Sequence, residues 1–207
     1  MNGDDPAPPP RAVIFDLDGT LADSLLDFDA IREEIGLRPG LPILEQLADA
    51  DPATVARAEV IMRRHERDAI AGATLTDGCA ELLARLAARR IPMGILTRNI
   101  REVVETFAAT FDLRFQAVYT REDGPPKPSP VGVLALCDRL GAPPAHTLTV
   151  GDYKYDVIAG RRAGCRTVLL HPGLTAADHE EWGAPDLVIR SLRELLPLFP
   201  AAVSRRS

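Results

Sequence analysis

The chain has 207 residues, of which 46% are hydrophobic and 26% charged, and its formal net charge is −6. This length fits one domain, or one domain with a modest insert, and the apolar share is enough for a sizeable core. The acidic balance argues against a nucleic-acid binder, which usually carries a basic patch. No apolar run reaches the roughly 18 residues that a membrane-spanning helix needs, so a membrane protein is not expected either.

The two ends of the chain differ in composition from the rest. The first ten residues combine acids with four prolines and lack the positive and apolar regions of a signal peptide, which predicts a disordered leader over residues 1–10. Residues 204–207 are expected to be frayed. Three widely separated cysteines show no zinc or redox spacing. Reduced thiols indicate a cytoplasmic setting.

Short apolar runs alternate with amphipathic helical patterns along most of the chain. The predicted strands are residues 12–15, 92–96, 117–119, 148–150, 167–170 and 187–189. The predicted helices are residues 78–90, 100–110, 130–140 and 153–163. Ser129 is expected to cap the third helix and Gly164 to end the fourth. This alternation predicts an α/β fold, a doubly wound parallel sheet with a Rossmann-like core and helices on both faces.

One stretch, residues 22–76, breaks this rhythm because it contains no predicted strand. Its helical patterns cover residues 22–35, 41–48 and 52–71. We therefore expect a small all-helical cap domain inserted into a core domain formed by residues 11–21 and 77–200. The turn between the first two cap helices carries Arg38, whose fixed fork of donors suits an anionic group. Arg38 is accordingly expected to contact the leaving-group end of a substrate.

Polar side chains follow the predicted strands at the points where these end. They are Asp16, Asp18, Thr97, Arg98, Lys127, Asp152 and Asp156. Because the carboxyl ends of parallel strands meet at one edge of the sheet, these side chains are expected to lie together. Arg98 fits either a contact with substrate phosphate or a place on the surface.

Carboxylates, a hydroxyl and a lysine at one sheet edge are the groups that phosphoryl transfer requires. Asp16 could attack phosphorus, since carboxylates form acyl phosphates. Asp18 could protonate the leaving oxygen and then take a proton from water. Asp16 and Asp152 could bind Mg²⁺, which prefers oxygen ligands. Thr97 and Lys127 could hold the phosphoryl oxygens, where charge neutralisation is most of the catalysis.

The stretch Asp16-Leu-Asp-Gly-Thr-Leu21, then Thr97, Lys127 and Gly151-Asp-Tyr-Lys-Tyr-Asp156, resembles the four motifs of the haloacid dehalogenase-like hydrolase superfamily. The match in order and context extends over residues 11–173. The helical insert resembles the small cap of the phosphoglycolate phosphatase and β-phosphoglucomutase branch. This cap is shorter than is usual for that branch, which argues against direct transfer of phosphoglycolate specificity.

The resemblance implies a role for each motif residue. Asp16 would be the nucleophile and a magnesium ligand, and Asp18 the acid/base whose backbone carbonyl is a further ligand. Asp152 would be a ligand, and Asp156 a supporting carboxylate outside the ligand shell. Which of Asp152 and Asp156 touches the ion varies within the superfamily.

The expected function is that of a magnesium-dependent phosphatase acting on a small phosphate monoester through an aspartyl-phosphate intermediate. The alternatives are a phosphomutase, a 2-haloacid dehalogenase and a non-catalytic regulatory module. A dehalogenase needs neither a metal nor a second acid, so Asp18 and Asp152 argue against it. The sequence leaves the phosphorylated metabolite open, among phosphoglycolate, sugar phosphates, nucleoside monophosphates and phosphorylated amino-acid metabolites. It also leaves the oligomeric state open.

Overall fold

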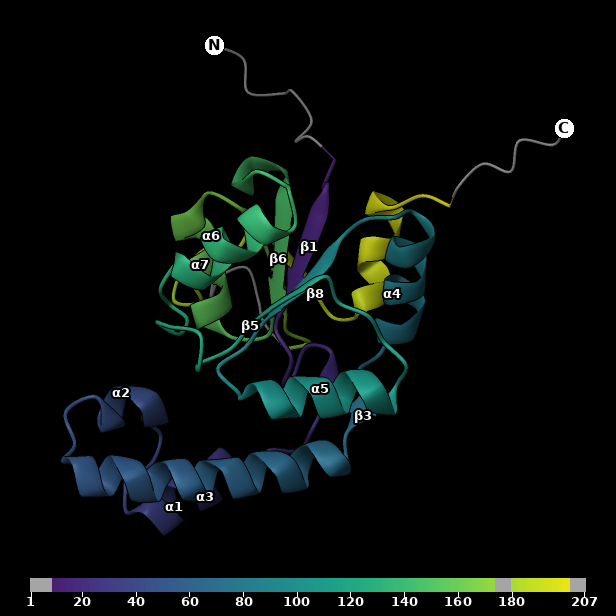
Figure 1. The fold of residues 1–207 in the computed structure, drawn as a ribbon. Helices are drawn as coiled ribbons and strands as arrows, with labels where there is room; N and C mark the ends of the chain where they lie inside the picture. The colour runs from purple at the N-terminus through teal and green to yellow at the C-terminus, as the bar shows by residue number, and fades with distance from the viewer. Residues whose placement is uncertain (1–8, 174–179, 202–207) are drawn as a thin grey trace, which may run out of the picture.

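A six-stranded sheet lies at the centre of the computed structural model, which describes residues 9–173 and 180–201 (Figure 1). Its strands are β1 (Ala12–Phe15), β4 (Met93–Leu96), β5 (Ala117–Tyr119), β6 (Thr147–Gly151), β7 (Arg166–Leu170) and β8 (Leu187–Ile189). All pair in parallel, in the order β5-β4-β1-β6-β7-β8. The predicted α/β fold is therefore confirmed. The frayed tail and all but the last two residues of the predicted leader lie outside the described residues.

The strand order reverses between β1 and β6. The chain adds β4 and β5 on one side of β1, then β6, β7 and β8 on the other. The carboxyl ends of β1 and β6 thus flank the point where open α/β sheets bind ligands. Phe15 pairs with Ile95 on one side and with Val150 on the other. Asp16, the next residue, is therefore level with the ends of both neighbouring strands.

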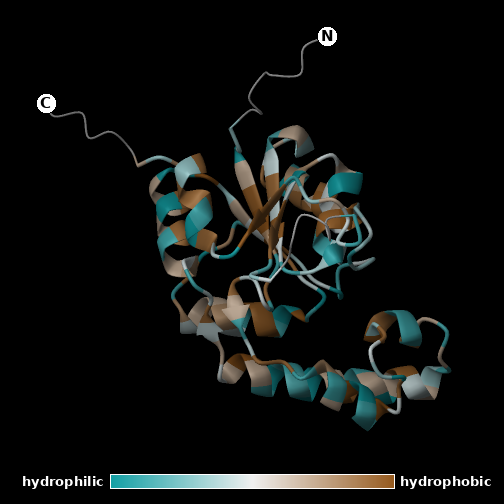
Figure 2. Cartoon of the chain, turned by 180° about the vertical axis from the view of Figure 1, so that it is seen from behind, coloured by the Kyte–Doolittle hydropathy of each residue, from teal (hydrophilic) through white to brown (hydrophobic). Residues whose placement is uncertain are grey.

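Helices cover both faces of the sheet. One face carries α4 (Cys79–Ala88), α5 (Arg101–Thr110) and the 3₁₀ helix η3 (Leu192–Leu198), and the other carries α6 (Val131–Arg139) and α7 (Lys154–Ala163). The short 3₁₀ helix η1 (Pro144–His146) leads into β6. Val13 and Phe15 pack toward the first group, and Ala12 and Ile14 toward the second. Both faces of the sheet are buried, and β1 and β4 consist of apolar residues and one glycine, whereas β6 also carries two buried threonines (Figure 2).

One predicted helix end is confirmed and one is wrong. Gly164 ends α7 in the left-handed conformation, with φ 82°. The expected Ser129 cap of α6 is displaced by one residue: Pro130 takes the cap position and the helix begins at Val131. Pro130 has near-helical dihedral angles but no N–H, so the Ser129 hydroxyl accepts only a long 3.4 Å bond from the Val131 N–H.

The helices of the insert pack against one another. The insert, or cap, contains α1 (Phe28–Ile35), α2 (Ile43–Leu47) and α3 (Pro52–Ala71). Their facing sides bury an apolar cluster of their own, made of Ile31, Ile35, Ile43, Leu47, Ala58, Ile61 and Met62. Figure 1 shows this cap beyond the carboxyl ends of the strands, with α3 running beside α5. The cap therefore faces the edge of the sheet where the polar residues gather.

Two expectations for the insert are wrong. It contains the short strands β2 (Ala22–Asp23) and β3 (Thr74–Leu75), which pair antiparallel where the cap joins the core. A two-residue strand is too short for an alternating pattern to reveal it. The first cap helix begins at Phe28 rather than residue 22, because Leu25 is left-handed, with φ 52°, and the Asp27 side chain caps the helix.

Leu86 tests the packing of α4 on the sheet. Its side chain is fully buried, so Leu86→Ala should lower the free energy of unfolding by about 2–5 kcal/mol through lost burial and a residual cavity. The control is Val60→Ala on α3, because Val60 is 70% exposed and its loss should change stability by less than about 0.5 kcal/mol. Urea denaturation measures both, and equal losses would contradict this packing.

Candidate active site

A cavity of about 450 Å³ lies between the strand ends and the cap. This volume is typical of sites for small molecules. Seven predicted site residues line it: Asp16, Asp18, Thr97, Arg98, Lys127, Asp152 and Asp156. The cap adds an apolar wall that includes Phe28, Ile31, Ile43 and Met62. The structure therefore brings together residues that lie up to 140 positions apart in the chain (16 to 156).

Lys127 connects two of the carboxylates. Its Nζ lies 2.7 Å from Asp16 Oδ1 and 2.5 Å from Asp156 Oδ1, and the side chain is only 3% exposed. Burial by itself lowers the pKa of Lys127, but the charges of Asp156 and Asp16 outweigh that effect and raise the pKa above its ordinary value. The lysine is therefore a buried ammonium group held between two acids, and not a solvated loop residue.

Three carboxylates crowd together beside this lysine. Oxygens of Asp16, Asp152 and Asp156 lie within 4.8 Å of one another. Burial, and then the charges of the other two acids, raise the pKa of Asp152 to about 8. Gly19 permits this crowding, because a Cβ atom there would lie 2.2 Å from Asp152 Oδ2. A set of hard oxygen donors that repel one another is the kind of site Mg²⁺ occupies, so these residues fit that ion.

Asp156 has partners for both of its oxygens. Oδ1 accepts from Lys127, and Oδ2 accepts from the backbone N–H of Tyr153 at 3.1 Å, which caps the start of α7. Both carboxylate oxygens of Asp156 are therefore already engaged by protein groups.

Asp18 is held by two residues to which the sequence assigned no catalytic role. Its Oδ1 accepts from the Ser24 hydroxyl at 2.8 Å, and its Oδ2 accepts from the Asn99 side chain at 3.1 Å. Burial, and then the charge of Asp16, raise the pKa of Asp18, so the carboxyl retains a proton more readily than an exposed one. Asn99 follows the same strand as Thr97, and this position was a usable signal. Ser24 follows directly after the two-residue strand β2, which no pattern in the sequence predicts, so no signal indicated its role.

Thr97 is buried at the end of β4, where its hydroxyl oxygen accepts the backbone N–H of Asn99 at 3.0 Å. It is not the cap of α5, since that position belongs to Ile100. The hydroxyl hydrogen can therefore be donated into the cavity that Thr97 lines.

The two predicted substrate arginines have different surroundings. Arg98 lines the cavity but is paired with Glu45 of the cap through two hydrogen bonds of 2.9 and 2.7 Å, and its guanidinium lies over the Tyr155 ring. Arg38 is exposed and does not line the cavity. Its backbone exchanges hydrogen bonds with the Gln46 side chain at 2.9 and 3.1 Å, which fixes the loop within the cap.

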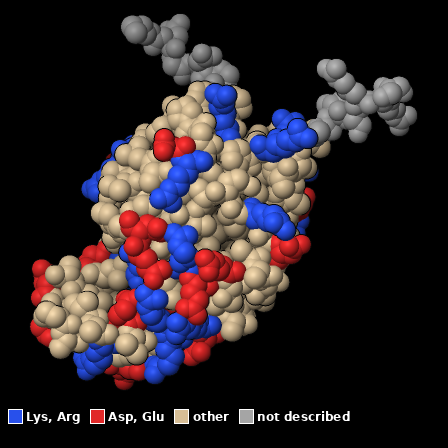
Figure 3. All heavy atoms as spheres, viewed as in Figure 1, with Lys and Arg blue, Asp and Glu red and all other residues tan. Residues whose placement is uncertain are grey.

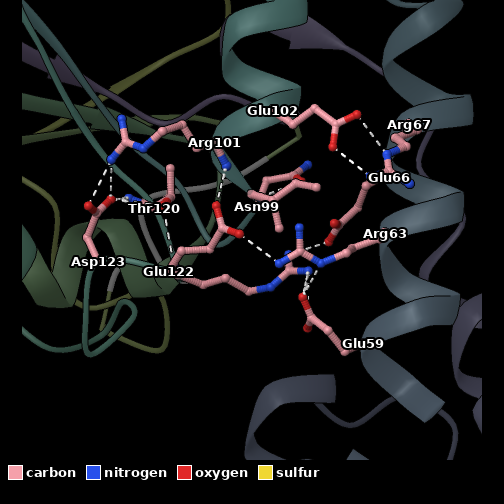
Figure 4. Close-up of polar contacts among 12 residues, drawn as sticks. Glu59, Arg63, Glu66, Arg67, Asn99, Arg101, Glu102, Thr120, Glu122 and Asp123 are labelled. Carbon is pink, nitrogen blue, oxygen red and sulfur yellow. Dashed lines mark hydrogen bonds and ion pairs between the residues drawn. The ribbon is translucent and has the colours of Figure 1, made fainter. Parts of the chain in front are cut away.

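Further ion pairs join the cap to the core along α3. Arg63 pairs with Glu122 and Arg67 with Glu102, each at 2.7 Å. Figure 3 shows acidic and basic side chains gathered where the cap meets the core, and Figure 4 shows these pairs reaching across from α3. Pairs this exposed contribute little stability singly.

Residues 26–170 match the family model described as haloacid dehalogenase-like hydrolase. The chain belongs to this family. It is 33% identical to an uncharacterized hydrolase of Saccharomyces cerevisiae, with 91% of this chain and 90% of the relative covered. It is 31% identical to a phosphoglycolate phosphatase of Chromobacterium violaceum, over 91% of this chain and 96% of the relative. The residues that the family model matches begin at 26, after Asp18. The interpretation of the first motif therefore depends on the site geometry described above.

A solved structure supports the same fold. A hydrolase from Pseudomonas syringae superposes with a TM-score of 0.77 at 22% identity, covering 90% of this chain and 96% of that one. Among the residues described in this chain, none of the helices combines the length and apolar character needed to cross a membrane.

The crowded carboxylates predict a pH dependence of stability in the metal-free protein. Burial raises the pKa of Asp152 to about 8 in the folded protein, well above that of an exposed aspartate, so the folded state binds more protons between these values. Stability should therefore fall as pH rises from about 4 to 8, and Mg²⁺ should reduce the fall by replacing the proton. Thermal melts at pH 5 and 8 in EDTA or magnesium measure this.

Asp152→Asn provides the comparison for this experiment, because the amide keeps the shape and cannot ionise. It should flatten the pH dependence in EDTA and weaken magnesium binding measured by calorimetry. Unchanged magnesium affinity in this variant would contradict the ligand assignment.

Proposed function

We propose that this protein is a magnesium-dependent phosphatase that hydrolyses a small phosphate monoester through an aspartyl-phosphate on Asp16. The observation that carries the proposal is the convergence of Asp16, Lys127 and Asp152 on one cavity at the carboxyl ends of β1 and β6. Membership of a hydrolase family supports it, as does the Chromobacterium violaceum relative named phosphoglycolate phosphatase.

Asp16 would act as the nucleophile. Its Oδ1 accepts hydrogen bonds from Lys127 Nζ and from the Leu17 backbone N–H, both at 2.7 Å, which orients the carboxylate. Its Oδ2 would form a bond to phosphorus while the bond from phosphorus to the ester oxygen breaks, and the electron pair leaves with that oxygen.

Asp18 would transfer the protons. In the first step its raised pKa lets it hold a proton and give it to the leaving oxygen. In the second step it would take a proton from the water that attacks phosphorus. That attack releases inorganic phosphate and restores the Asp16 carboxylate. Ser24 and Asn99 keep the Asp18 side chain in place for both transfers.

The remaining residues would bind charge. Thr97 and Lys127 would hold the phosphoryl oxygens, where catalysis depends mainly on positioning and neutralisation. Asp16, Asp152 and the backbone carbonyl of Asp18 would hold Mg²⁺. When bound, this ion would neutralise negative charge on the phosphoryl group.

Two observations favour hydrolysis over the alternatives. A 2-haloacid dehalogenase has no use for a second acid held as firmly as Asp18. A phosphomutase must hold a second phosphate near the cap, yet Arg98 is already paired with Glu45 and Arg121 with Glu66.

Asp16→Asn should abolish phosphatase activity, with a fall in kcat of about 10⁴-fold or more, because the amide is a poor nucleophile. The nearly isosteric change should leave the fold intact by circular dichroism. Asp138→Asn is the control, since Asp138 is exposed at the end of α6 and away from the cavity. Activity retained in purified Asp16→Asn would refute the nucleophile assignment.

Asp18→Asn should lower kcat by about 10²–10⁴-fold, the usual effect of losing a positioned proton-transfer group. The loss should be smaller for aryl phosphates than for alkyl phosphates, because a good leaving group needs less protonation. Steady-state rates on p-nitrophenyl phosphate and propyl phosphate measure the difference. Identical losses on both would argue against the acid/base role.

A further inference from the structure

Glu66 of α3 lines the cavity and has one buried carboxylate oxygen without a hydrogen-bond partner among the described residues. The residue is 7% exposed and lines the cavity from the cap side. Its Oε1 accepts from Arg121 Nη1 at 2.5 Å, while its Oε2 is buried without a hydrogen-bond partner among the described residues. In the part of the chain that the structure describes, buried side-chain atoms of Tyr119 and His146 also lack a partner, but neither residue lines this cavity.

An unpaired buried carboxylate oxygen is unfavourable. Removing such a group from water without a hydrogen bond is costly, and more so when the group is charged. Native proteins contain few such atoms, and each one calls for an explanation, such as a catalytic role or a bound water or ion. The placement of Glu66 at the cavity therefore indicates a hydrogen-bond donor that arrives with the substrate.

Glu66 lies on the side of the cavity where a leaving group would sit. Asp18 and Glu66 line the same cavity, Asp18 from the core and Glu66 from α3 of the cap. Asp18 is the group proposed to protonate the leaving oxygen. A leaving group bonded to that oxygen would therefore extend toward Glu66 and the cap.

The arginines of this wall are already neutralised. The Arg121 side chain is 8% exposed, and its guanidinium donates to Glu66, to Glu59 and to the backbone carbonyl of Arg98. Arg98 is itself paired with Glu45. Figure 4 shows Glu59 and Glu66 projecting from α3 toward the core. Arg32, the third arginine that lines the cavity, pairs with Asp29. Among the described residues, each arginine of the lining therefore already has an acidic partner, and the wall offers a hydrogen-bond acceptor.

We propose that Glu66 binds a hydroxyl group of the leaving group, so that the preferred substrate is a sugar or polyol phosphate rather than a phosphorylated carboxylic acid. The inference rests on the proposed phosphatase function. A neutral donor suits the site because the charge of Glu66 is already shared with Arg121. A carboxylate such as that of phosphoglycolate would meet Glu66 Oε2 with like charge.

Substrate selectivity tests the first half of the inference. The probes are glycerol 3-phosphate, ribose 5-phosphate and glucose 6-phosphate, compared with propyl phosphate, phosphoglycolate and phosphoethanolamine. We expect the best hydroxylated probe to exceed each of the other three in kcat/KM by about tenfold or more, since a site built for a hydroxyl rejects substrates that lack it. Phosphoglycolate, propyl phosphate or phosphoethanolamine equalling that probe would overturn the inference.

Glu66→Gln tests the residue itself. The amide oxygen can keep the Arg121 contact, which turns an NH₂ donor toward the substrate in place of Oε2. We expect kcat/KM for the best hydroxylated probe to fall about 10–100-fold, as for loss of a hydrogen bond to a charged group. Turnover of p-nitrophenyl phosphate, which has no hydroxyl, should stay within about threefold because nothing in that substrate contacts Glu66.

Glu59→Gln is the matched control, because Glu59 lies on the same helix and pairs with the same arginine but does not line the cavity. It should leave the ratio between the two substrates unchanged. An equal loss on both substrates in Glu66→Gln, or a changed ratio in Glu59→Gln, would assign Glu66 a structural role only. A wild-type protein that hydrolyses none of the probes, p-nitrophenyl phosphate included, would instead refute the phosphatase function.

Discussion

The contact of Lys127 with Asp16 and Asp156 is the interaction on which the site depends. These three side chains come from the end of β1, the loop after β5 and the start of α7. Buried charges are tolerated only when paired, and removing one member of such a group is strongly destabilising. The lysine therefore holds the ends of separate elements in one geometry. Its positive charge also offsets the repulsion among the three carboxylates at this edge.

The parallel sheet supplies the frame for that contact. The strand order turns back between β1 and β6, so Asp16 and Asp152 extend from adjacent strand ends. Gly19 lets the first loop approach Asp152 closely, with φ 76° and no room for a side chain. The cap covers the cavity, and ion pairs such as Arg67 with Glu102 join it to the core. Under the proposed function, chemistry and selectivity would thus lie on different parts of the chain.

The cap wall changes how a relative's name should be read. The Chromobacterium violaceum relative is named for phosphoglycolate, whose leaving group is an acid. In this chain Glu66 of the cap lines the cavity, and Arg121 is paired with Glu59 and Glu66. Electrostatic complementarity decides which leaving group is accepted, because like charges brought together in a partly buried cavity repel strongly. Arg38, which sequence reasoning favoured for this contact, is exposed elsewhere.

The sequence by itself determined the sheet, the cap insert and the residues that meet at the strand ends. Apolar runs ending in acids are local signals, and parallel pairing turns them into one site. Only the tertiary structure decided which side chains form hydrogen bonds and ion pairs with these residues. Ser24 and Asn99 hold Asp18, and Glu66 faces the cavity through pairing with Arg121. Such contacts join positions far apart in the chain, and they depend on how the cap packs on the core. No spacing pattern within a single segment records that packing.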